Sequence, residues 1–131
     1  MKLFDLHADL GYAVWQKHEA GYTDILSSFY TDALRKGGIN AVFMACWFDG
    51  TQDFDQMCAM IHALKADIAR SDDVRLVMDA SLIDWSDDKI YAMLSVEGMC
   101  GIDRDPEARI DWLYAQGVRM GALCWNEENA L

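Results

Sequence analysis

The sequence predicts an α/β fold in which parallel strands alternate with helices. Near-continuous apolar runs of strand length, such as residues 39–48 and 89–98, alternate with segments whose apolar residues recur at helical spacing. Strands that alternate with helices are joined by right-handed crossovers into a parallel sheet. No linker, low-complexity run or internal repeat divides the 131 residues, so we expect one domain over residues 1–131.

The composition excludes several classes of protein. Hydrophobic residues make up 53% of the chain, which is too many for a disordered protein. The net charge of −11 would repel phosphate backbones and anionic lipids, so we expect neither nucleic acid nor a membrane as partner. No apolar run approaches the roughly 20 residues that a membrane span needs, and the N-terminus has no apolar signal core.

The cysteines are widely spaced and form no Cys-x-x-Cys pair. They are Cys46, Cys58, Cys100 and Cys124. All but Cys58 lie in or beside apolar runs, where small buried thiols are common. We therefore expect all of them to be reduced, as in a cytoplasmic protein.

The first expected strand covers residues 3–10 and carries His7 and Asp9 near its end. Apolar residues flank it, so it is predicted to be buried. Because side chains alternate across a strand, His7 and Asp9 project to the same side, roughly 6.6 Å apart along it. An imidazole and a carboxylate can hold a divalent metal such as zinc. The alternative is a core histidine with Asp9 capping the next turn.

The next elements are predicted from glycines and apolar runs. Residues 11–21 are expected to form a loop with at most one helical turn. A helix over residues 27–36 is predicted to end at Gly37 and Gly38, because glycine adopts the left-handed conformation that terminates helices. The apolar run over residues 39–48 is predicted to be a strand covered on both faces.

The clearest helix is predicted over residues 53–70. Its apolar stripe at three-to-four spacing consists of Met57, Met60, Ile61, Leu64 and Ile68. A short strand over residues 74–78 and a short helix or turn over residues 81–88 follow. The next strand, residues 89–98, ends on an acid, Glu97.

The last predicted helix covers residues 106–116. Asp105 is expected to cap it, with Pro106 at its first position and Gly117 as its stop. Its inward residues are predicted to be Ile110, Leu113 and Tyr114. A final strand over residues 118–125 leads into the polar residues 126–129.

Three strands that are predicted to be buried thus end on polar groups. Such ends meet on one face of a parallel α/β fold, where active sites form. A carboxylate such as Glu97 is costly to bury without a partner, and a metal shared with His7 and Asp9 would supply one. The alternatives are an ion pair with Arg119 or a capping role in the following turn.

Four blocks of the sequence, in order and spacing, resemble the N-terminal half of the renal (membrane) dipeptidase family, metallopeptidases of the amidohydrolase superfamily. The blocks are Asp5-Leu6-His7-Ala8-Asp9-Leu10, Leu34-Arg35-Lys36-Gly37-Gly38-Ile39-Asn40-Ala41-Val42-Phe43, Leu94-Ser95-Val96-Glu97-Gly98, and Gly117-Val118-Arg119-Met120 through Leu123-Cys124-Trp125-Asn126-Glu127-Glu128-Asn129. The resemblance implies about half of a TIM-type (β/α)8 barrel.

The resemblance also implies a dipeptidase site with two zinc ions. By motif match, His7 and Asp9 would ligate one ion and Glu97 would bridge both. Two cations would lower the pKa of a shared water that attacks the peptide bond of a dipeptide. Where better-studied members have a substrate-contacting His, this chain has Trp125, so Trp125 and Asn126 are the candidate substrate contacts.

The chain departs from the family in two further respects. Ala8 stands where the family often has Asn between the two ligands. A complete barrel needs about 250 residues. The later metal-binding histidines of the family have no counterpart here, because His18 and His62 lie in the wrong contexts.

Half a barrel leaves open sheet edges and an uncovered apolar face. We therefore expect either a homo-oligomer that covers them or a missing C-terminal half. Two other functions stay open. The chain could be another amidohydrolase-type metal-dependent hydrolase, or an inactive truncated remnant that acts as an interaction or structural module.

Overall fold

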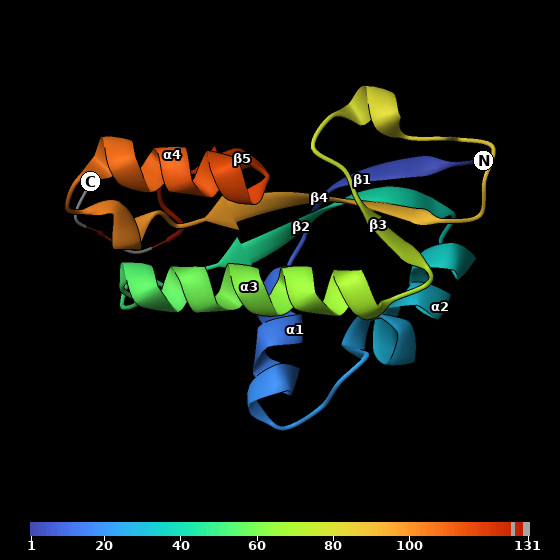
Figure 1. The fold of residues 1–131 in the computed structure, drawn as a ribbon, viewed down its shortest axis with the longest axis horizontal. Coiled ribbons are helices and arrows are strands. Elements are labelled where there is room, and N and C mark those ends of the chain that lie inside the picture. The colour runs from blue at the N-terminus through green and yellow to red at the C-terminus, as the bar shows by residue number, and fades with distance from the viewer. Residues whose placement is uncertain (127, 130–131) are drawn as a thin grey trace.

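The computed structural model describes residues 1–126 and 128–129 and contains one parallel sheet (Figure 1). Its strands are β1 (Leu3–Ala8), β2 (Ile39–Trp47), β3 (Val74–Leu76), β4 (Ile90–Glu97) and β5 (Val118–Ala122). Its longer helices are α1 (Leu10–Glu19), α2 (Thr31–Lys36), α3 (Phe54–Arg70) and α4 (Pro106–Gln116). A π-helical turn covers Leu26–Tyr30, and short 3-10 turns cover Ala80–Leu82 and Cys100–Ile102. The prediction of alternating helices and parallel strands is confirmed.

The strands β2 and β4 form the centre of the sheet. They pair in unbroken register from Ala41 opposite Tyr91 to Trp47 opposite Glu97. β1 lies on the other side of β2. The remaining edge of β4 is shared, because β3 pairs with its first residues and β5 with its last. All these strands run in the same direction, so their C-terminal ends meet at one end of the sheet.

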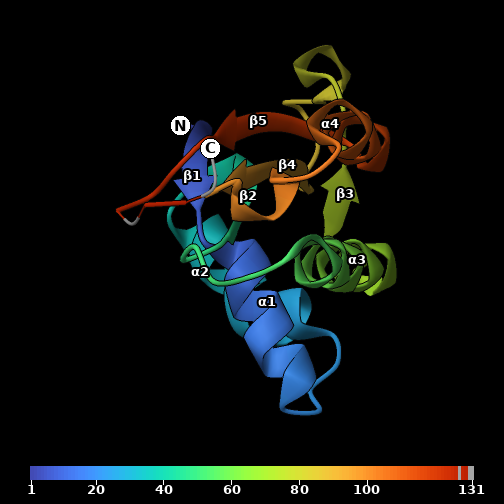
Figure 2. The same cartoon turned by 90° about the vertical axis from the view of Figure 1, so that its left-hand side faces the viewer.

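The two faces of the sheet are covered differently. α1, α2 and α3 lie on one side, where they enclose the larger core together with the side chains of β2 and β4 that face them (Figures 1 and 2). On the opposite face, residues 77–83 pack over the N-terminal half of the sheet and bury Phe43, Tyr91 and Met93. The C-terminal half of that face has no helix over it among the described residues, and the candidate site lies there.

The edge strands are more exposed than the sequence predicts. Residues 3–10 and 118–125 were expected to form buried strands, but Leu6 on β1 is 60% exposed and most of β5 is exposed. Each of these strands pairs with only one neighbour, so apolar residues on them lack the cover that β2 and β4 have. β1 also ends at Ala8 and β5 at Ala122, short of the predicted bounds.

The helix α1 replaces the loop predicted over residues 11–21. It buries Leu10 and Val14, which lie one turn apart, against the sheet. Gly11 is a packing contact and not a helix breaker, because a Cβ there would lie 2.6 Å from the Ala45 carbonyl oxygen and 2.7 Å from Cys46 Sγ. Glycine therefore lets the start of α1 approach β2 closely.

The helix α3 matches its prediction. Asp53 accepts a hydrogen bond from the Gln56 N–H, and the Gln56 side chain accepts one from the Asp53 N–H, which makes a reciprocal capping box. All residues of the predicted apolar stripe are buried. None of the described helices is long and apolar enough to cross a bilayer.

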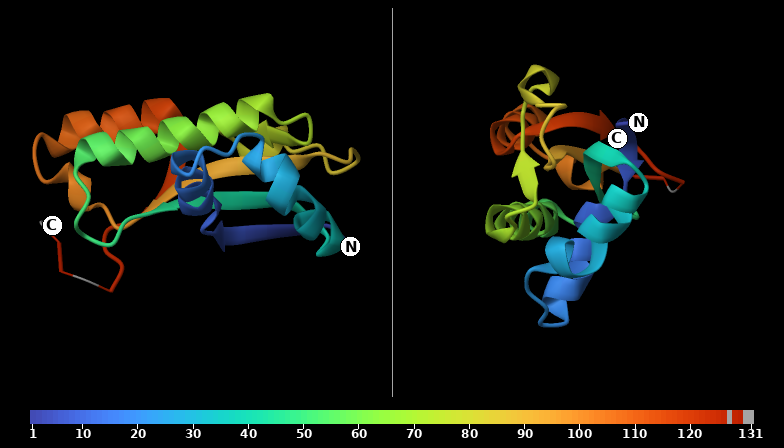
Figure 3. Two further views of the ribbon diagram at one scale, coloured as in Figure 1. Left: turned by 90° about the horizontal axis from the view of Figure 1, so that it is seen from below. Right: turned by 90° about the vertical axis from the view of Figure 1, so that its right-hand side faces the viewer.

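The helix α4 differs from its prediction at both its start and its buried face. Asp105 has a left-handed backbone with φ of 45° and makes no capping hydrogen bond through its side chain. Of the predicted inward residues, Leu113 is buried, whereas Ile110 is 47% and Tyr114 64% exposed. α4 lies beside α3, where Trp112 meets Phe54 edge to face (Figure 3). Gly117 ends the helix with φ of 100°, as predicted.

The cysteines are all free thiols, but their burial varies. Cys46 and Cys100 are buried and Cys58 is half-buried, whereas Cys124 is exposed because the chain has left β5 there. Complete burial raises the pKa of Cys46 to about 12, so this thiol stays protonated and unreactive in the folded chain.

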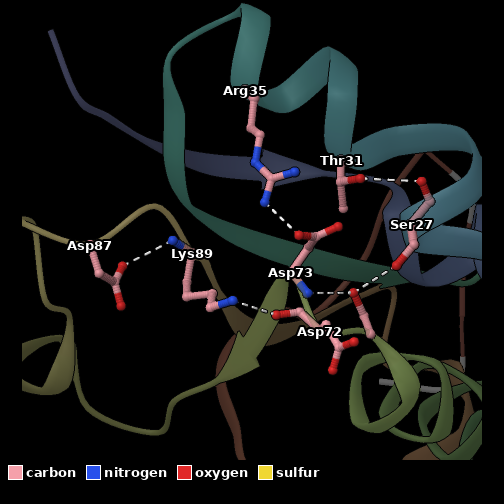
Figure 4. A network of polar contacts seen from close by, with 8 residues as sticks. Ser27, Thr31, Arg35, Asp72, Asp73, Asp87 and Lys89 are labelled. Carbon is pink, nitrogen blue, oxygen red and sulfur yellow. Dashed lines mark hydrogen bonds and ion pairs between the residues drawn. The ribbon is translucent and has the colours of Figure 1, made fainter.

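A polar network ties the N-terminal ends of the strands together (Figure 4). Arg35 of α2 pairs with Asp73 before β3 at 2.6 Å, and this carboxylate raises the pKa of the guanidinium. Lys89, before β4, donates to the Asp72 carbonyl. These contacts join α2 to the loops before β3 and β4, at the end of the sheet opposite the candidate site.

Asp67 is a buried carboxylate on α3 that the sequence pattern did not single out. It is 2% exposed. Its Oδ2 accepts the Ile25 N–H and its Oδ1 accepts the Leu26 N–H, each at 2.8 Å. These amides begin the π-helical turn, where helical N–H groups lack internal partners. Asp67 thus fixes the path of the chain between α1 and α2.

Replacing this carboxylate should destabilise the fold. We expect Asp67→Ala to lower the free energy of unfolding by about 2–4 kcal/mol, because two buried amides lose a charged acceptor. Urea unfolding measures the change, and Asp111→Ala on the exposed face of α4 is the matched control. Equal effects of the two substitutions would contradict this role of Asp67.

Candidate metal site

The side chains of His7, Asp9 and Glu97 come together at the C-terminal end of the sheet. His7 is the penultimate residue of β1, Asp9 links β1 to α1, and Glu97 is the last residue of β4. β2 lies between β1 and β4, so His7 and Glu97 approach each other across the end of β2. The expected proximity of His7 and Asp9 is present, although Asp9 lies just beyond the strand.

The three groups are close enough to share one ion. His7 Nε2 lies 3.3 Å from Asp9 Oδ1 and 3.2 Å from Glu97 Oε2. The ligand atoms of all three groups lie within 4.8 Å of one another. The side chains of His7, Asp9 and Glu97 are 45%, 61% and 22% exposed, so the cluster is open to solvent on one side.

This donor set fits zinc. Zinc binds imidazole nitrogen and carboxylate oxygen in tetrahedral geometry, and bonds of about 2.0–2.2 Å place neighbouring ligand atoms roughly 3.3–3.6 Å apart. The distances from His7 Nε2 to the two carboxylates are close to that range. Three protein ligands with a fourth position open are the pattern of catalytic zinc sites. Among residues 1–126 and 128–129, no second cluster of such ligands occurs.

The other histidines lie elsewhere, as predicted. His18, near the end of α1, contacts Glu19 at 3.6 Å. His62 on α3 packs edge to face against Trp112 with ring centroids 5.6 Å apart. Neither belongs to the cluster, so a second metal ion would need ligands beyond the three residues found here.

The alternative partner for Glu97, Arg119, is engaged elsewhere. Its guanidinium donates to the carbonyls of Met78 and Tyr114 and lies over the Tyr114 ring. The ion pair between Glu97 and Arg119 is therefore absent. Glu97 instead meets the imidazole of His7.

The backbone on both sides of Glu97 is held by hydrogen bonds. The Glu97 carbonyl accepts the Phe48 N–H at 2.8 Å, and the Gly98 N–H donates to Ala122 at 3.0 Å. Gly98 has φ of 80°, and a Cβ on it would collide with the Phe48 carbonyl oxygen. A glycine is thus required directly after the acid.

A cavity of about 300 Å³ opens beside the cluster. His7, Ser95 and Glu97 line it from β1 and β4, and residues 120–122 of β5 line it as well. It lies on the face of the sheet that carries no helix over its C-terminal half.

Aromatic rings stand next to the cluster. Trp47 pairs in register with Glu97, and its ring meets Trp125 edge to face with centroids 5.0 Å apart. Tyr12 of α1 contacts Trp47 from another direction at 4.8 Å. Trp125 is 43% exposed and Asn126 is exposed. Of the polar tail predicted after β5, Glu127 lies outside the described residues.

The sequence interpretation missed Trp47 and Ser95. Both lie on the same face of the sheet as Glu97, because they alternate with the core residues of β2 and β4. The available signal was their position near the polar end of a buried strand. Trp47 lies in the same row of the sheet as Glu97, and Ser95 lies two residues before it.

The glycine after the acid can be tested directly. We expect Gly98→Ala to lower the free energy of unfolding by about 2 kcal/mol or more, because it adds a collision to the cost of a left-handed backbone. Gly21→Ala is the matched control, since φ there is 87° and nothing lies within 4 Å of its added Cβ. The control should lose only about 1 kcal/mol in the same urea titration. Equal losses would show that the contact with Phe48 does not matter.

Comparisons with known proteins find matches to this chain in both sequence and structure. A sequence model of the family described as membrane dipeptidase (peptidase family M19) matches residues 1–131. The crystal structure of the dipeptidase AC, a metallopeptidase of family M19, is similar to this chain with a TM-score of 0.77 and 15% sequence identity. No curated protein matches the sequence.

The structural similarity covers 98% of this chain and 44% of the dipeptidase chain. At this identity the likeness is one of fold. Dipeptidases of this family are TIM barrels, so the parallel sheet described above is about half of such a barrel. The predicted half-barrel is confirmed.

Proposed function

The chain belongs to the membrane dipeptidase family, peptidase family M19, and on that basis we propose that it serves metal-dependent hydrolysis of dipeptides. The observation that carries the proposal is the cluster of His7, Asp9 and Glu97 at the C-terminal end of the sheet. Active sites of TIM barrels lie at that end. The family match favours a dipeptidase over other amidohydrolase-type hydrolases.

The proposed metal is zinc. His7 and Asp9 would ligate it, and Glu97 would be shared between it and a second ion in the complete site. Zinc supplies a water of lowered pKa and polarises the carbonyl of the substrate. The role of the chain is to fix the donor atoms, through the end of β1, the start of α1 and the glycine after Glu97.

Trp125 and Asn126 are the proposed substrate contacts. The Trp125 ring is partly exposed and is held by Trp47, directly beside the row of Glu97. A flat apolar surface at this place suits the side chain of a small peptide. The predicted cytoplasmic location stays a prediction.

Zinc binding tests the proposal at its first step. We expect the chain to bind zinc and His7→Ala and Glu97→Ala to bind it at least about tenfold more weakly, because each loses one of three ligands. Calorimetric titration and metal analysis after dialysis measure this, with His62→Ala on α3 as the control. A wild-type chain that takes up no zinc would favour the inactive interaction module.

Catalysis is tested with the same variants. Dipeptide hydrolysis is assayed with and without a separately supplied C-terminal half of an M19 dipeptidase, before and after a chelator. Activity that needs the added half and is lost with the chelator supports the proposal. Chelator-resistant activity would contradict it.

The half-barrel has open sheet edges and exposed apolar side chains that a further polypeptide segment could cover. The chain spans 44% of the length of the dipeptidase it matches. Apolar side chains are exposed on the edge strands β1 and β5, on α4 and after β5: Leu6, Ile110, Tyr114, Met120 and Leu123. A groove of about 200 Å³ lies between α4 and β5 among several of them. We propose that either a second copy of the chain or a C-terminal half covers these open edges and the exposed face of α4.

The chain by itself is therefore expected to self-associate. The double substitution Ile110→Glu with Tyr114→Glu should shift it toward the monomer, because it places charges on the open face of α4. Sedimentation velocity measures the shift. Leu82→Glu is the control, since Leu82 is 62% exposed, close to the 64% of Tyr114, but lies on the segment before β4. A well-folded wild-type monomer at all concentrations would contradict the expectation.

A further inference from the structure

Ser95 carries a buried hydroxyl that has no hydrogen-bond partner. The residue is 2% exposed. Among the described residues, only its Oγ and the indole nitrogen of Trp47 are buried side-chain polar atoms without a partner. An unpaired buried hydroxyl costs desolvation free energy, so each instance in a folded protein calls for an explanation such as an ordered water or a functional role.

The position of Ser95 connects it to the candidate metal site. It precedes Glu97 by two residues on β4, so both side chains project from the same face. Ser95 lines the 300 Å³ cavity together with His7 and Glu97, whereas Trp47 does not line it. The two unpaired atoms are therefore not equivalent, because only Ser95 belongs to the lining of the space beside the ligands.

The surroundings of Ser95 leave this cavity as the source of a partner. Its register neighbour on β2 is Ala45, which has no polar side chain and is fully buried. The preceding residue on the same face of β4 is Met93. Ser95 is thus the first polar side chain beneath Glu97 on this face of the strand.

The cavity can hold ordered water. A water molecule occupies about 30 Å³ in the liquid and needs two to four polar partners. The hydroxyl of Ser95 donates one hydrogen bond and accepts two, and the carboxylate of Glu97 offers further acceptors. In the described contacts, Oε2 of Glu97 meets His7, so a water on the Ser95 side can address the same carboxylate without displacing the imidazole.

We propose that Ser95 is a positioning residue whose hydroxyl, through an ordered water in this cavity, holds the Glu97 carboxylate in its metal-ligating orientation. This inference rests on the proposed metal site and adds a residue to it. Groups that hydrogen-bond to a metal ligand fix its orientation, and losing one typically weakens metal binding about 10–100-fold.

An isosteric pair separates the hydroxyl from the volume it fills. Ser95→Thr keeps the hydroxyl. Ser95→Val has the same shape as the Thr variant but carries a methyl group in place of its hydroxyl. We expect the Thr variant to bind zinc as the wild type does and the Val variant to bind it about 10-fold or more weakly. Competition with a chromophoric chelator measures the affinities. Ser27→Ala is the control for loss of a serine hydroxyl far from the site.

Two readouts distinguish positioning from packing. The visible absorption of bound Co²⁺ should differ between the Val variant and the other proteins, because the orientation of Glu97 changes. A crystal structure of the metal-free wild type should show a water within hydrogen-bond distance of both Ser95 Oγ and Glu97. Urea midpoints of all variants establish that each is folded.

The outcomes separate the two proposals. Equal zinc affinities and Co²⁺ spectra of the Thr and Val variants, with zinc bound by the wild type, overturn the role of Ser95 and leave the metal site standing. A dry cavity beside Ser95 also overturns that role. A wild-type chain without zinc affinity overturns the metal site, and the role of Ser95 with it.

Discussion

The parallel pairing of β2 with β4 is the constraint on which the rest of the structure depends. Both strands are buried on both faces along most of their length, and their register is unbroken from Ala41 to Trp47. A slip by one residue would exchange the core-facing and site-facing side chains of either strand. The register therefore places Glu97 beside Trp47 and keeps Ser95 in line beneath the acid. α1 and α3 pack on the face of the sheet that this pairing forms.

The elements predicted well are those whose own apolar residues, in a continuous run or at helical spacing, are buried in the structure. The apolar runs of β2 and β4 and the stripe of α3 are of this kind. α1 was missed because residues 11–21, which begin and end with glycine, were interpreted as a loop, whereas Gly11 allows close contact with β2. Ile110 and Tyr114 follow helical spacing on α4, but spacing alone does not show which other element covers an apolar stripe. In the structure only Leu113 of the predicted inward residues is covered. The same limit explains the exposed edge strands.

The sequence predicts those residues of the candidate site that lie at the ends of apolar strands. His7, Asp9 and Glu97 were found because polar residues end apolar runs, and parallel topology brings such ends together. Asp67 was not, because its partners lie 41 and 42 residues away and no local pattern records that distance. The unpaired state of the Ser95 hydroxyl is likewise a property of its tertiary surroundings and leaves no trace in the sequence.

The polar network at the N-terminal ends of the strands has a consequence for how the chain can change. Arg35, Asp73 and Lys89 join α2 to the loops there, while the candidate metal ligands stand at the other end of the same strands. Residues that secure the scaffold and residues that would select a substrate therefore do not compete for the same positions. The loop that carries Trp125, the proposed substrate contact, lies away from this network, so its sequence can change without disturbing the contacts that hold the scaffold.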